Sequence, residues 1–209
     1  MKILSHRGYW LRADERNTVN AFQRSFNMQF GTETDIRDLN GKLVISHDMS
    51  QDGAITAEEF FKLYSAIEPT LVLALNIKAD GLQTPLKESL IKNKIENYFV
   101  FDMSIPDTLG YIKNNIRFFS RQSEYETEPA FYNECAGIWL DAFNGTWYNS
   151  ELISRHINNK KQVAIVSPDL HKRDHLIFWG QLKEDRIHHE TDVFLCTDFP
   201  EEALKYFND

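Results

Sequence analysis

Short runs of β-branched and aromatic residues recur along the chain, and most are followed by a segment in which apolar residues recur at helical spacing. This alternation is typical of parallel strands joined by crossover helices. The pattern predicts eight strands, at residues 2–6, 32–37, 71–77, 98–101, 117–120, 137–140, 162–166 and 192–196. It also predicts eight helices, at residues 18–28, 56–66, 84–92, 106–113, 128–134, 149–158, 173–182 and 200–207.

The order of these elements indicates the fold class. Eight strand-then-helix units of about 26 residues each favour a (β/α)8 barrel, and an open doubly wound sheet is the alternative. Asn40-Gly41 is a two-residue turn signal followed by a returning strand at 42–45, so we expect a small hairpin inserted after the second strand. No Pro/Gly/Ser-rich linker divides the chain, and residues 1–209 are therefore predicted to form a single domain.

Composition and charge exclude several classes of partner. The chain has 31 acidic and 23 basic residues, a formal net charge of −8, which disfavours a nucleic acid. Its longest apolar runs, such as 71–75, are far shorter than the roughly 20 residues that span a bilayer. With no signal-peptide pattern at the start, we expect a cytoplasmic protein without an integral membrane segment. Cys135 and Cys196 lack metal-type spacing and are expected to be reduced core thiols.

Polar residues at the carboxyl ends of barrel strands point into one shared mouth, whereas the middles of the strands fill the core. Such a set of residues holds histidines, a carboxylate pair and several cations, which hydrolysis of a phosphate ester at a divalent metal requires. The predicted strand ends carry His6, Arg7, Glu33, Asp35, His47, Asn76, Lys78, Asp102, Arg121, Glu124, Asp141, Asp169, His171 and Asp198.

The acidic pair and the two histidines each allow two interpretations. Glu33 and Asp35 are two residues apart on a strand, so both carboxylates can face one hard cation, and a solvated acidic turn is the alternative. His6 and His47 could each be a hydrogen-bonded structural residue. His6, however, is followed by Arg7, whose planar guanidinium matches two phosphate oxygens, and this favours phosphate chemistry.

Several short motifs resemble, in order and spacing, those of the glycerophosphodiester phosphodiesterase family. They are His6-Arg7-Gly8, Asn17-Thr18 at the start of a helix, Gly31-Thr32-Glu33-Thr34-Asp35, and Gly41-Lys42-Leu43-Val44-Ile45-Ser46-His47-Asp48. Two later motifs agree more loosely, namely Asn76-Ile77-Lys78 with the family's Glu-Ile-Lys, and Thr197-Asp198-Phe199-Pro200 with its Thr-Asp-x-Pro. The resemblance therefore extends over nearly the whole chain, although its specific part is residues 6–48.

This resemblance implies a (β/α)8 barrel that cleaves a phosphodiester into an alcohol and a phosphomonoester with the help of a divalent cation. It assigns His6 and His47 as the acid–base pair, and two imidazoles can divide those roles near neutral pH. Arg7 and Lys78 would neutralise the phosphoryl oxygens. By the same resemblance Glu33 and Asp35 are metal ligands, and an all-oxygen ligand set favours Mg²⁺ or Ca²⁺.

The chain departs from the family at its third metal ligand. The glutamate expected there is Asn76, which offers an amide oxygen but no charge. A compensating carboxylate could come from Glu124, Asp102 or Asp141. We expect Glu124, because Arg121 and neighbouring polar residues cluster just past the fifth strand; a surface loop in which Arg121 pairs with Glu124 is the alternative.

A second departure follows the seventh strand, where Ile165-Val166-Ser167-Pro168 replaces the family's Trp-Thr-Val-Asn. Asp169 and His171, which follow this strand, could contact the non-phosphate half of the substrate, and a solvated loop is the favoured alternative. Together with Arg121 and Asp141, they are assigned to substrate binding.

The leading hypothesis is therefore a phosphodiesterase that hydrolyses a small glycerophosphodiester-like substrate. One alternative keeps the barrel but makes the reaction an intramolecular transfer that releases a cyclic phosphate. A further alternative is a barrel that binds a phosphorylated ligand without catalysis.

Overall fold

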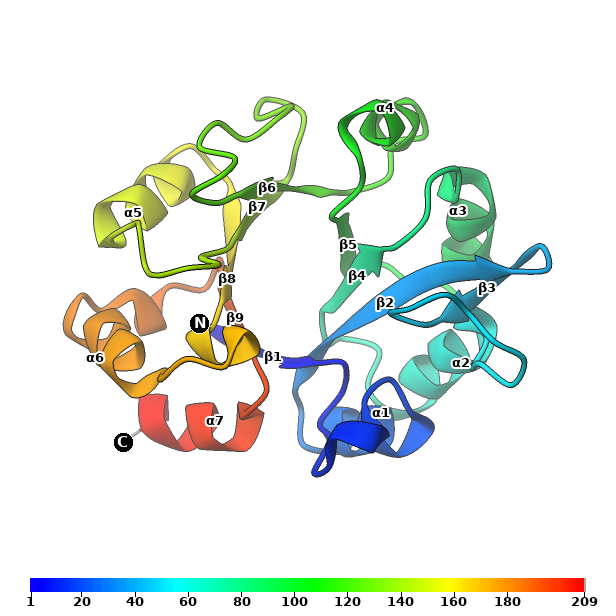
Figure 1. Cartoon of the computed structure of the whole chain (residues 1–209), viewed down its shortest axis with the longest axis horizontal. Helices are drawn as coiled ribbons and strands as arrows, with labels where there is room; N and C mark the ends of the chain where they lie inside the picture. The colour runs from blue at the N-terminus through cyan, green and yellow to red at the C-terminus, as the bar shows by residue number, and fades with distance from the viewer. Residues whose placement is uncertain (209) are drawn as a thin grey trace. The chain divides into compact units, whose positions relative to one another are not determined.

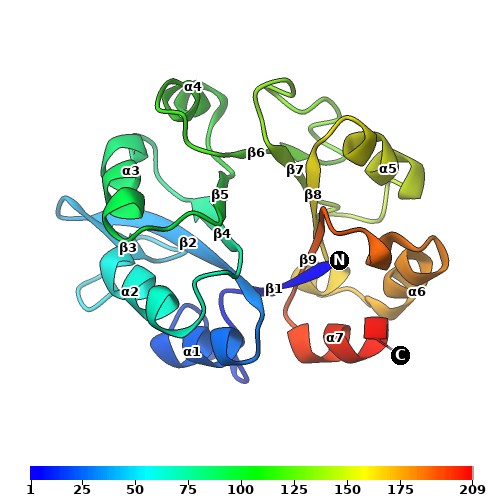
Figure 2. The same ribbon diagram turned by 180° about the vertical axis from the view of Figure 1, so that it is seen from behind.

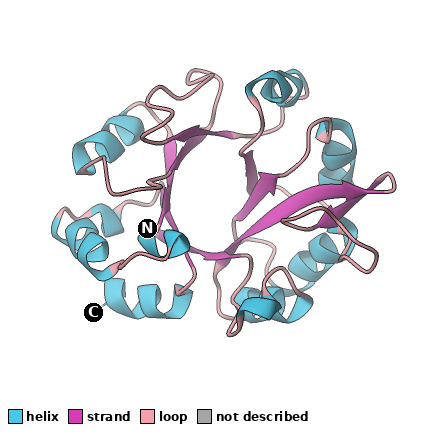
Figure 3. Cartoon of the chain, viewed as in Figure 1, coloured by secondary structure: helices cyan, strands magenta, loops and turns pink. Residues whose placement is uncertain are grey.

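The computed structural model describes residues 1–208, which form two compact units. The N-terminal unit comprises residues 6–118, and the C-terminal unit comprises residues 1–5 and 119–208. Each unit contains parallel strands joined by helices, as the alternation in the sequence predicts (Figures 1 and 3).

In the N-terminal unit the parallel strands follow the order β5-β4-β2, and β3 pairs antiparallel with β2. The hairpin that Asn40-Gly41 predicts is present: both residues have positive φ, 50° and 77°, as a type I′ turn requires. The elements of this unit are η1 (Ala13–Glu15), α1 (Val19–Asn27), β2 (Gly31–Leu39), β3 (Lys42–Ile45), α2 (Ala57–Ile67), β4 (Leu73–Ile77), α3 (Gln83–Lys92), β5 (Tyr98–Phe101) and α4 (Ile105–Lys113).

In the C-terminal unit the parallel strands follow the order β1-β9-β8-β7-β6. Helices α5, α6 and α7 lie along one side of these strands in both views (Figures 1 and 2). The elements are β1 (Lys2–His6, of which His6 is counted with the other unit), β6 (Phe119–Gln122), β7 (Gly137–Leu140), α5 (Ser150–Asn158), β8 (Gln162–Val166), η2 (Pro168–His171), α6 (Leu176–Glu184), η3 (Ile187–His189), β9 (Val193–Thr197) and α7 (Pro200–Asn208).

The helix predicted at 128–134 is wrong. The chain makes a single turn there, in which the backbone N–H groups of Glu134 and Cys135 both donate to the carbonyl of Phe131. Phe131 has a φ of 54°, which ends any right-handed helix at that position. The carbonyl of Ala130 accepts a hydrogen bond from Ser120 Oγ, so a partner in β6 replaces the helical one.

Two other boundaries differ from the prediction. The strand predicted at 117–120 occurs two residues later as β6, where Phe119 pairs with Gly137 of β7. The helix predicted from residue 173 begins as α6 at Leu176, because Lys172 has a φ of 59° and Arg173 N–H closes a turn back to Pro168. The η2 turn therefore occupies the chain before α6 can start.

Aromatic side chains dominate the core of each unit. In the N-terminal unit, Phe22 of α1 packs edge-on against Phe60 of α2 at 4.6 Å between ring centroids. Phe26 and Tyr64 make a second contact between the same two helices. In the C-terminal unit Phe119 of β6 packs against Phe194 of β9. Burial of these large rings holds the helices and strands of each unit in fixed positions. The residues at the ends of the strands are therefore held in place by the core.

Candidate active site

The His6-Arg7-Gly8 segment forms a sharp turn directly after β1. Arg7 and Gly8 have positive φ values of 58° and 81°. A Cβ atom at position 8 would lie 2.8 Å from the Cβ of Ala21 in α1, so only glycine fits. The backbone N–H of Arg7 donates to the carbonyl of Glu33 at 2.9 Å, and it also lies 3.2 Å from Glu33 Oε2. The turn is thereby attached to β2.

Glu33 and Asp35 lie two residues apart on β2, as the sequence predicts, and both are buried, with exposed fractions of 2% and 0%. Side chains hold Asp35 on several sides. Arg7 Nε is 3.2 Å from Asp35 Oδ2, Lys78 Nζ is 3.5 Å from Oδ1, and Asn17 Nδ2 donates to Oδ2 at 2.8 Å. The structure therefore brings both predicted cations to one carboxylate of the pair.

Asn17 is a residue of this cluster that sequence reasoning did not assign to the site. Its Oδ1 accepts a hydrogen bond from Thr34 Oγ1 at 2.9 Å, while its Nδ2 donates to Asp35. Asn17 has a φ of 57°, which asparagine tolerates better than most residues. An asparagine immediately before the helix-capping Thr18 was the available signal.

Glu33 is the group with the most perturbed ionisation in this cluster. Burial and, next, the nearby charge of Asp35 raise the pKa of its carboxyl from 4.5 to about 7, against the opposing effect of His6, Arg7 and Lys78. His6 Nε2 lies 3.9 Å from Glu33 Oε2. A buried carboxyl beside a second carboxylate is stabilised in its charged form by added positive charge, and strongly shifted groups concentrate at functional sites.

Asn76 lies directly opposite Asp35 in the parallel pairing of β4 with β2. Two buried oxygens, Asp35 Oδ1 and Asn76 Oδ1, accept no hydrogen bond from any residue in the described part of the chain, although the ammonium group of Lys78 lies 3.5 Å from Asp35 Oδ1. Buried acceptors without a donor are unusual and costly. Carboxylate and amide oxygens are ligands of Mg²⁺ and Ca²⁺, so Glu33, Asp35 and Asn76 fit a hard divalent cation. No group of three or more His, Cys, Asp or Glu side chains within residues 1–208 could hold a metal ion, so the amide of Asn76 is needed for a third ligand here.

His47 lies on the loop after β3, and its side chain is 43% exposed. Its Nδ1 is 2.8 Å from Asp48 Oδ1, and the hydrogen bond to His47 lowers the pKa of the Asp48 carboxyl. The ionised carboxylate therefore accepts from Nδ1–H and leaves Nε2 as the outward nitrogen. The backbone N–H of Ser46, one residue earlier, donates to the carbonyl of Asp35 at 3.1 Å, which joins the start of this loop to β2.

The remaining predicted residues lie in the C-terminal unit. Glu124 Oε2 and Oε1 accept hydrogen bonds from the backbone N–H groups of Phe143 and Asn144, at 3.1 and 2.7 Å. Arg121 forms its ion pair with Glu126 rather than with Glu124, contrary to the alternative interpretation of this loop. Glu124 therefore anchors a loop in this structure.

Asp141 and His171 are brought together, with His171 Nε2 at 2.7 Å from Asp141 Oδ1. Asp169 does not join this pair. Its Oδ2 accepts hydrogen bonds from Thr197 Oγ1 and from the backbone N–H of Asp198, so it connects η2 to the end of β9. Among the four residues assigned to substrate binding, all within residues 1–208, a hydrogen bond joins Asp141 and His171.

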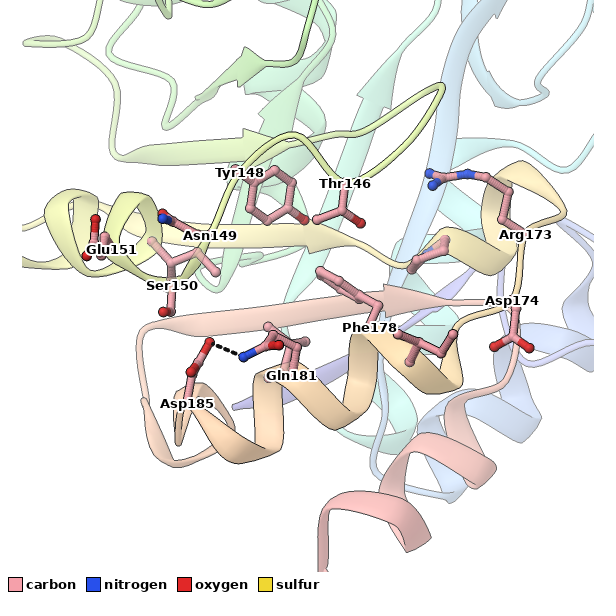
Figure 4. Close-up of a pocket in the computed structure, with 14 residues that line it drawn as sticks. Thr146, Tyr148, Asn149, Ser150, Glu151, Arg173, Asp174, Phe178, Gln181 and Asp185 are labelled. Atoms are coloured by element: carbon pink, nitrogen blue, oxygen red, sulfur yellow. Dashed lines mark hydrogen bonds between the residues drawn. The ribbon is translucent and has the colours of Figure 1, made fainter.

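A cavity of about 700 Å³ lies elsewhere in the C-terminal unit, between the start of α5 and α6 (Figure 4). Tyr148, Ile153 and Phe178 form much of its apolar lining, and Glu151 and Asp185 are among its polar residues. None of the predicted site residues lines it.

No model of a protein family matches the sequence, and neither does any curated protein. Solved structures do match. A candidate glycerophosphodiester phosphodiesterase from Galdieria sulphuraria has a TM-score of 0.78 at 17% identity, over 100% of this chain and 98% of the other. A phosphodiesterase from Oleispira antarctica, solved with the product sn-glycerol-3-phosphate, has a TM-score of 0.70 at 13% identity, over 100% and 97%.

The fold matches that of glycerophosphodiester phosphodiesterases. A Ca²⁺-dependent phosphatidylinositol-specific phospholipase C from Streptomyces antibioticus is less similar, with a TM-score of 0.55 at 10% identity over 99% and 95% of the two chains. At identities this low, structural similarity establishes the fold alone. This similarity confirms the predicted fold class, a (β/α)8 barrel with the extra strand β3 paired to β2. Within residues 1–208, no helix is both long and apolar enough to cross a membrane.

Proposed function

We propose that this protein is a metal-dependent phosphodiesterase that hydrolyses a small glycerophosphodiester-like substrate to an alcohol and a phosphomonoester. The observation that carries the proposal is the buried Glu33–Asp35 pair on β2, with Arg7 and Lys78 at ion-pair distance from Asp35. The fold of the phosphodiesterases described above supports it, and the Oleispira antarctica protein among them was solved with a phosphomonoester product.

Acid–base catalysis is assigned to the two histidines. One of them takes a proton from the attacking oxygen, and the other donates a proton to the leaving alkoxide. Asp48 accepts from Nδ1–H of His47 and so fixes the tautomer in which Nε2 can exchange a proton. His6, with Nε2 at 3.9 Å from Glu33, lies beside the carboxylate pair.

Charge stabilisation is assigned to Arg7 and Lys78, which neutralise phosphoryl oxygens as their charge grows in the transition state. Glu33, Asp35 and Asn76 would hold a Mg²⁺ or Ca²⁺ ion, and that ion supplies further positive charge at the phosphoryl group when it is bound. Glu124 remains a predicted additional ligand, although both of its carboxylate oxygens accept backbone hydrogen bonds.

Turnover of bis(p-nitrophenyl) phosphate and of a panel of glycerol-, ethanolamine-, sugar- and nucleotide-linked diesters tests the proposal. We expect turnover that EDTA abolishes and that falls by roughly 10² to 10⁴-fold in each of His6→Ala and His47→Ala. His189→Ala, at an exposed histidine of η3, is the matched control and should keep the wild-type rate.

Two outcomes would replace the proposal. A cyclic phosphate product that carries no label from ¹⁸O water, detected by ³¹P NMR, would indicate the intramolecular reaction instead of hydrolysis. Binding of phosphorylated ligands without turnover of any diester would indicate a non-catalytic barrel.

A further inference from the structure

The formal charges around Asp35 balance within the N-terminal unit. Counted as fully ionised groups, Glu33 and Asp35 contribute two negative charges and Arg7 and Lys78 contribute two positive ones, so the formal sum is zero. Any proton that Glu33 keeps makes this sum more positive. The four side chains are largely enclosed, with exposed fractions of 3% and 0% for the two carboxylates and 19% and 20% for the two cations. Charges in such surroundings are screened less than charges at the surface.

The third oxygen donor does not alter this balance. Asn76 lies opposite Asp35 across the strand pair, and its Oδ1 is buried without a hydrogen-bond donor within residues 1–208. An amide oxygen can coordinate a hard cation, but it contributes no negative charge. A divalent ion that entered alone would therefore bring the sum to +2, with Arg7 and Lys78 both repelling it.

We propose that the divalent cation and the phosphate group of the ligand bind this site together, each increasing the affinity for the other. A phosphodiester brings a charge of −1 and a phosphomonoester one of up to −2. When the cation and the phosphate ligand are both bound, the formal net charge of the site is therefore +1 or near zero, whereas with the cation alone it is +2. This inference rests on the proposed function, because it takes a phosphate group as the ligand of Arg7 and Lys78.

The coupling between the two ligands is measurable without turnover. Isothermal titration calorimetry of the full chain at one pH would follow Ca²⁺, and separately Mg²⁺, with and without saturating sn-glycerol-3-phosphate. We expect the cation to bind at least about tenfold more tightly with the phosphate present, within the usual range of coupling between two ligands. Linkage requires the same factor when the phosphate is titrated with and without the cation. Equal cation affinity in both titrations would overturn the proposal.

Asn76→Asp tests the cause of the coupling, because it adds one negative charge with little change in shape. This variant should bind the cation more tightly in the absence of phosphate, and the phosphate should then increase that affinity by a smaller factor. Asn115→Asp, which adds the same charge at an exposed turn residue after α4, should behave as wild type. An Asn76→Asp protein that binds the cation no more tightly than Asn115→Asp would contradict the proposal.

A second variant keeps the proposal testable if Asn76→Asp fails to fold, as judged by circular dichroism. Lys78→Met removes one repelling charge and should likewise strengthen cation binding in the absence of phosphate; unchanged affinity would count against the proposal. The failures of the two proposals are distinguishable. Coupled binding without diester turnover would reject the function only, and turnover with independent binding of the two ligands would reject the coupling only.

Discussion

Carboxylates near the strand ends of the two units differ in what holds them. In the N-terminal unit Asp35 is held by the side chains of Arg7, Lys78 and Asn17. In the C-terminal unit, Glu124 accepts a backbone N–H on each oxygen. Backbone donors fix a loop, whereas a carboxylate held by side chains can be reorganised by a ligand.

The histidines show the same contrast. His47 has one nitrogen on Asp48 and is 43% exposed. His156 of α5 is buried, and it uses both nitrogens, Nε2 with Gln122 Oε1 at 2.8 Å and Nδ1 with the Tyr132 hydroxyl at 2.9 Å. A histidine with both nitrogens engaged is suited to hold a structure together, and one with an outward nitrogen is suited to proton transfer.

The largest expected effect concerns activity. Glu33→Gln should lower kcat/KM for a diester by roughly 10³-fold or more, because it removes a negative charge from the proposed cation site. Glu124→Gln should lower it by less than about tenfold, since its oxygens are occupied by backbone donors. Steady-state kinetics of both variants decides the comparison. A decrease in kcat/KM for Glu124→Gln as large as that for Glu33→Gln would contradict the contrast between the two carboxylates. It would assign Glu124 to the metal, as the sequence predicts.

The next effect is the pH dependence of stability without metal. The raised pKa of Glu33, about 7 against 4.5, means that the folded state keeps a proton which the unfolded state releases. Its contribution to stability is therefore present below pH 4.5 and is lost as the pH rises through 7, by about 3 kcal/mol in total. Urea unfolding in EDTA at pH 5 and pH 8 measures this loss. Glu33→Gln should lack it and should be the more stable protein at pH 8.

A smaller pH effect on the free energy of unfolding, with the opposite sign, is expected from the C-terminal unit. Burial lowers the pKa of His156 from 6.5 to about 4, so the unfolded state takes up a proton that the folded state refuses. Stability is therefore full above pH 6.5 and falls as the pH drops toward 4, by about 2 kcal/mol after allowance for partial solvation. The same unfolding measurements with His156→Gln should give a flatter acid limb. An unchanged slope in the variant would show that another group carries it.

The smallest effect concerns the loop that Glu124 anchors. Glu124→Ala should lower the free energy of unfolding by about 1 kcal/mol, because two charge-assisted hydrogen bonds to Phe143 and Asn144 are lost. Chemical denaturation at neutral pH measures it, with Glu128→Ala as a control. A change below the experimental error would show that water replaces these hydrogen bonds at no cost.

Much of the fold could be predicted because it depends on local patterns. Alternating apolar periodicities located eight strands and seven of the eight predicted helices, and Asn40-Gly41 located the hairpin. The helix predicted at 128–134 failed because Ser120, ten residues away from Ala130, takes the hydrogen bond that a helix needs. Propensity in a short window contains no information about such a partner.

The site was predictable in part for the same reason. The spacing of Glu33 and Asp35 on one strand places both carboxylates on one face, and the structure agrees. The partners of Arg121 and His171 depend on tertiary packing. Arg121 pairs with Glu126 rather than Glu124, and His171 meets Asp141 from 30 residues away. Pattern analysis could nominate these residues but could not pair them.

Gly8 has a consequence for experiments that search for essential positions. It carries no functional group, yet any larger residue there would collide with Ala21 in a backbone conformation that few other residues adopt. If His6 and Arg7 have the roles proposed for them, saturation mutagenesis scored by survival would rank Gly8 beside both. Intolerance at position 8 would report lack of room, and only a chemical readout on purified variants would separate Gly8 from these two proposed site residues.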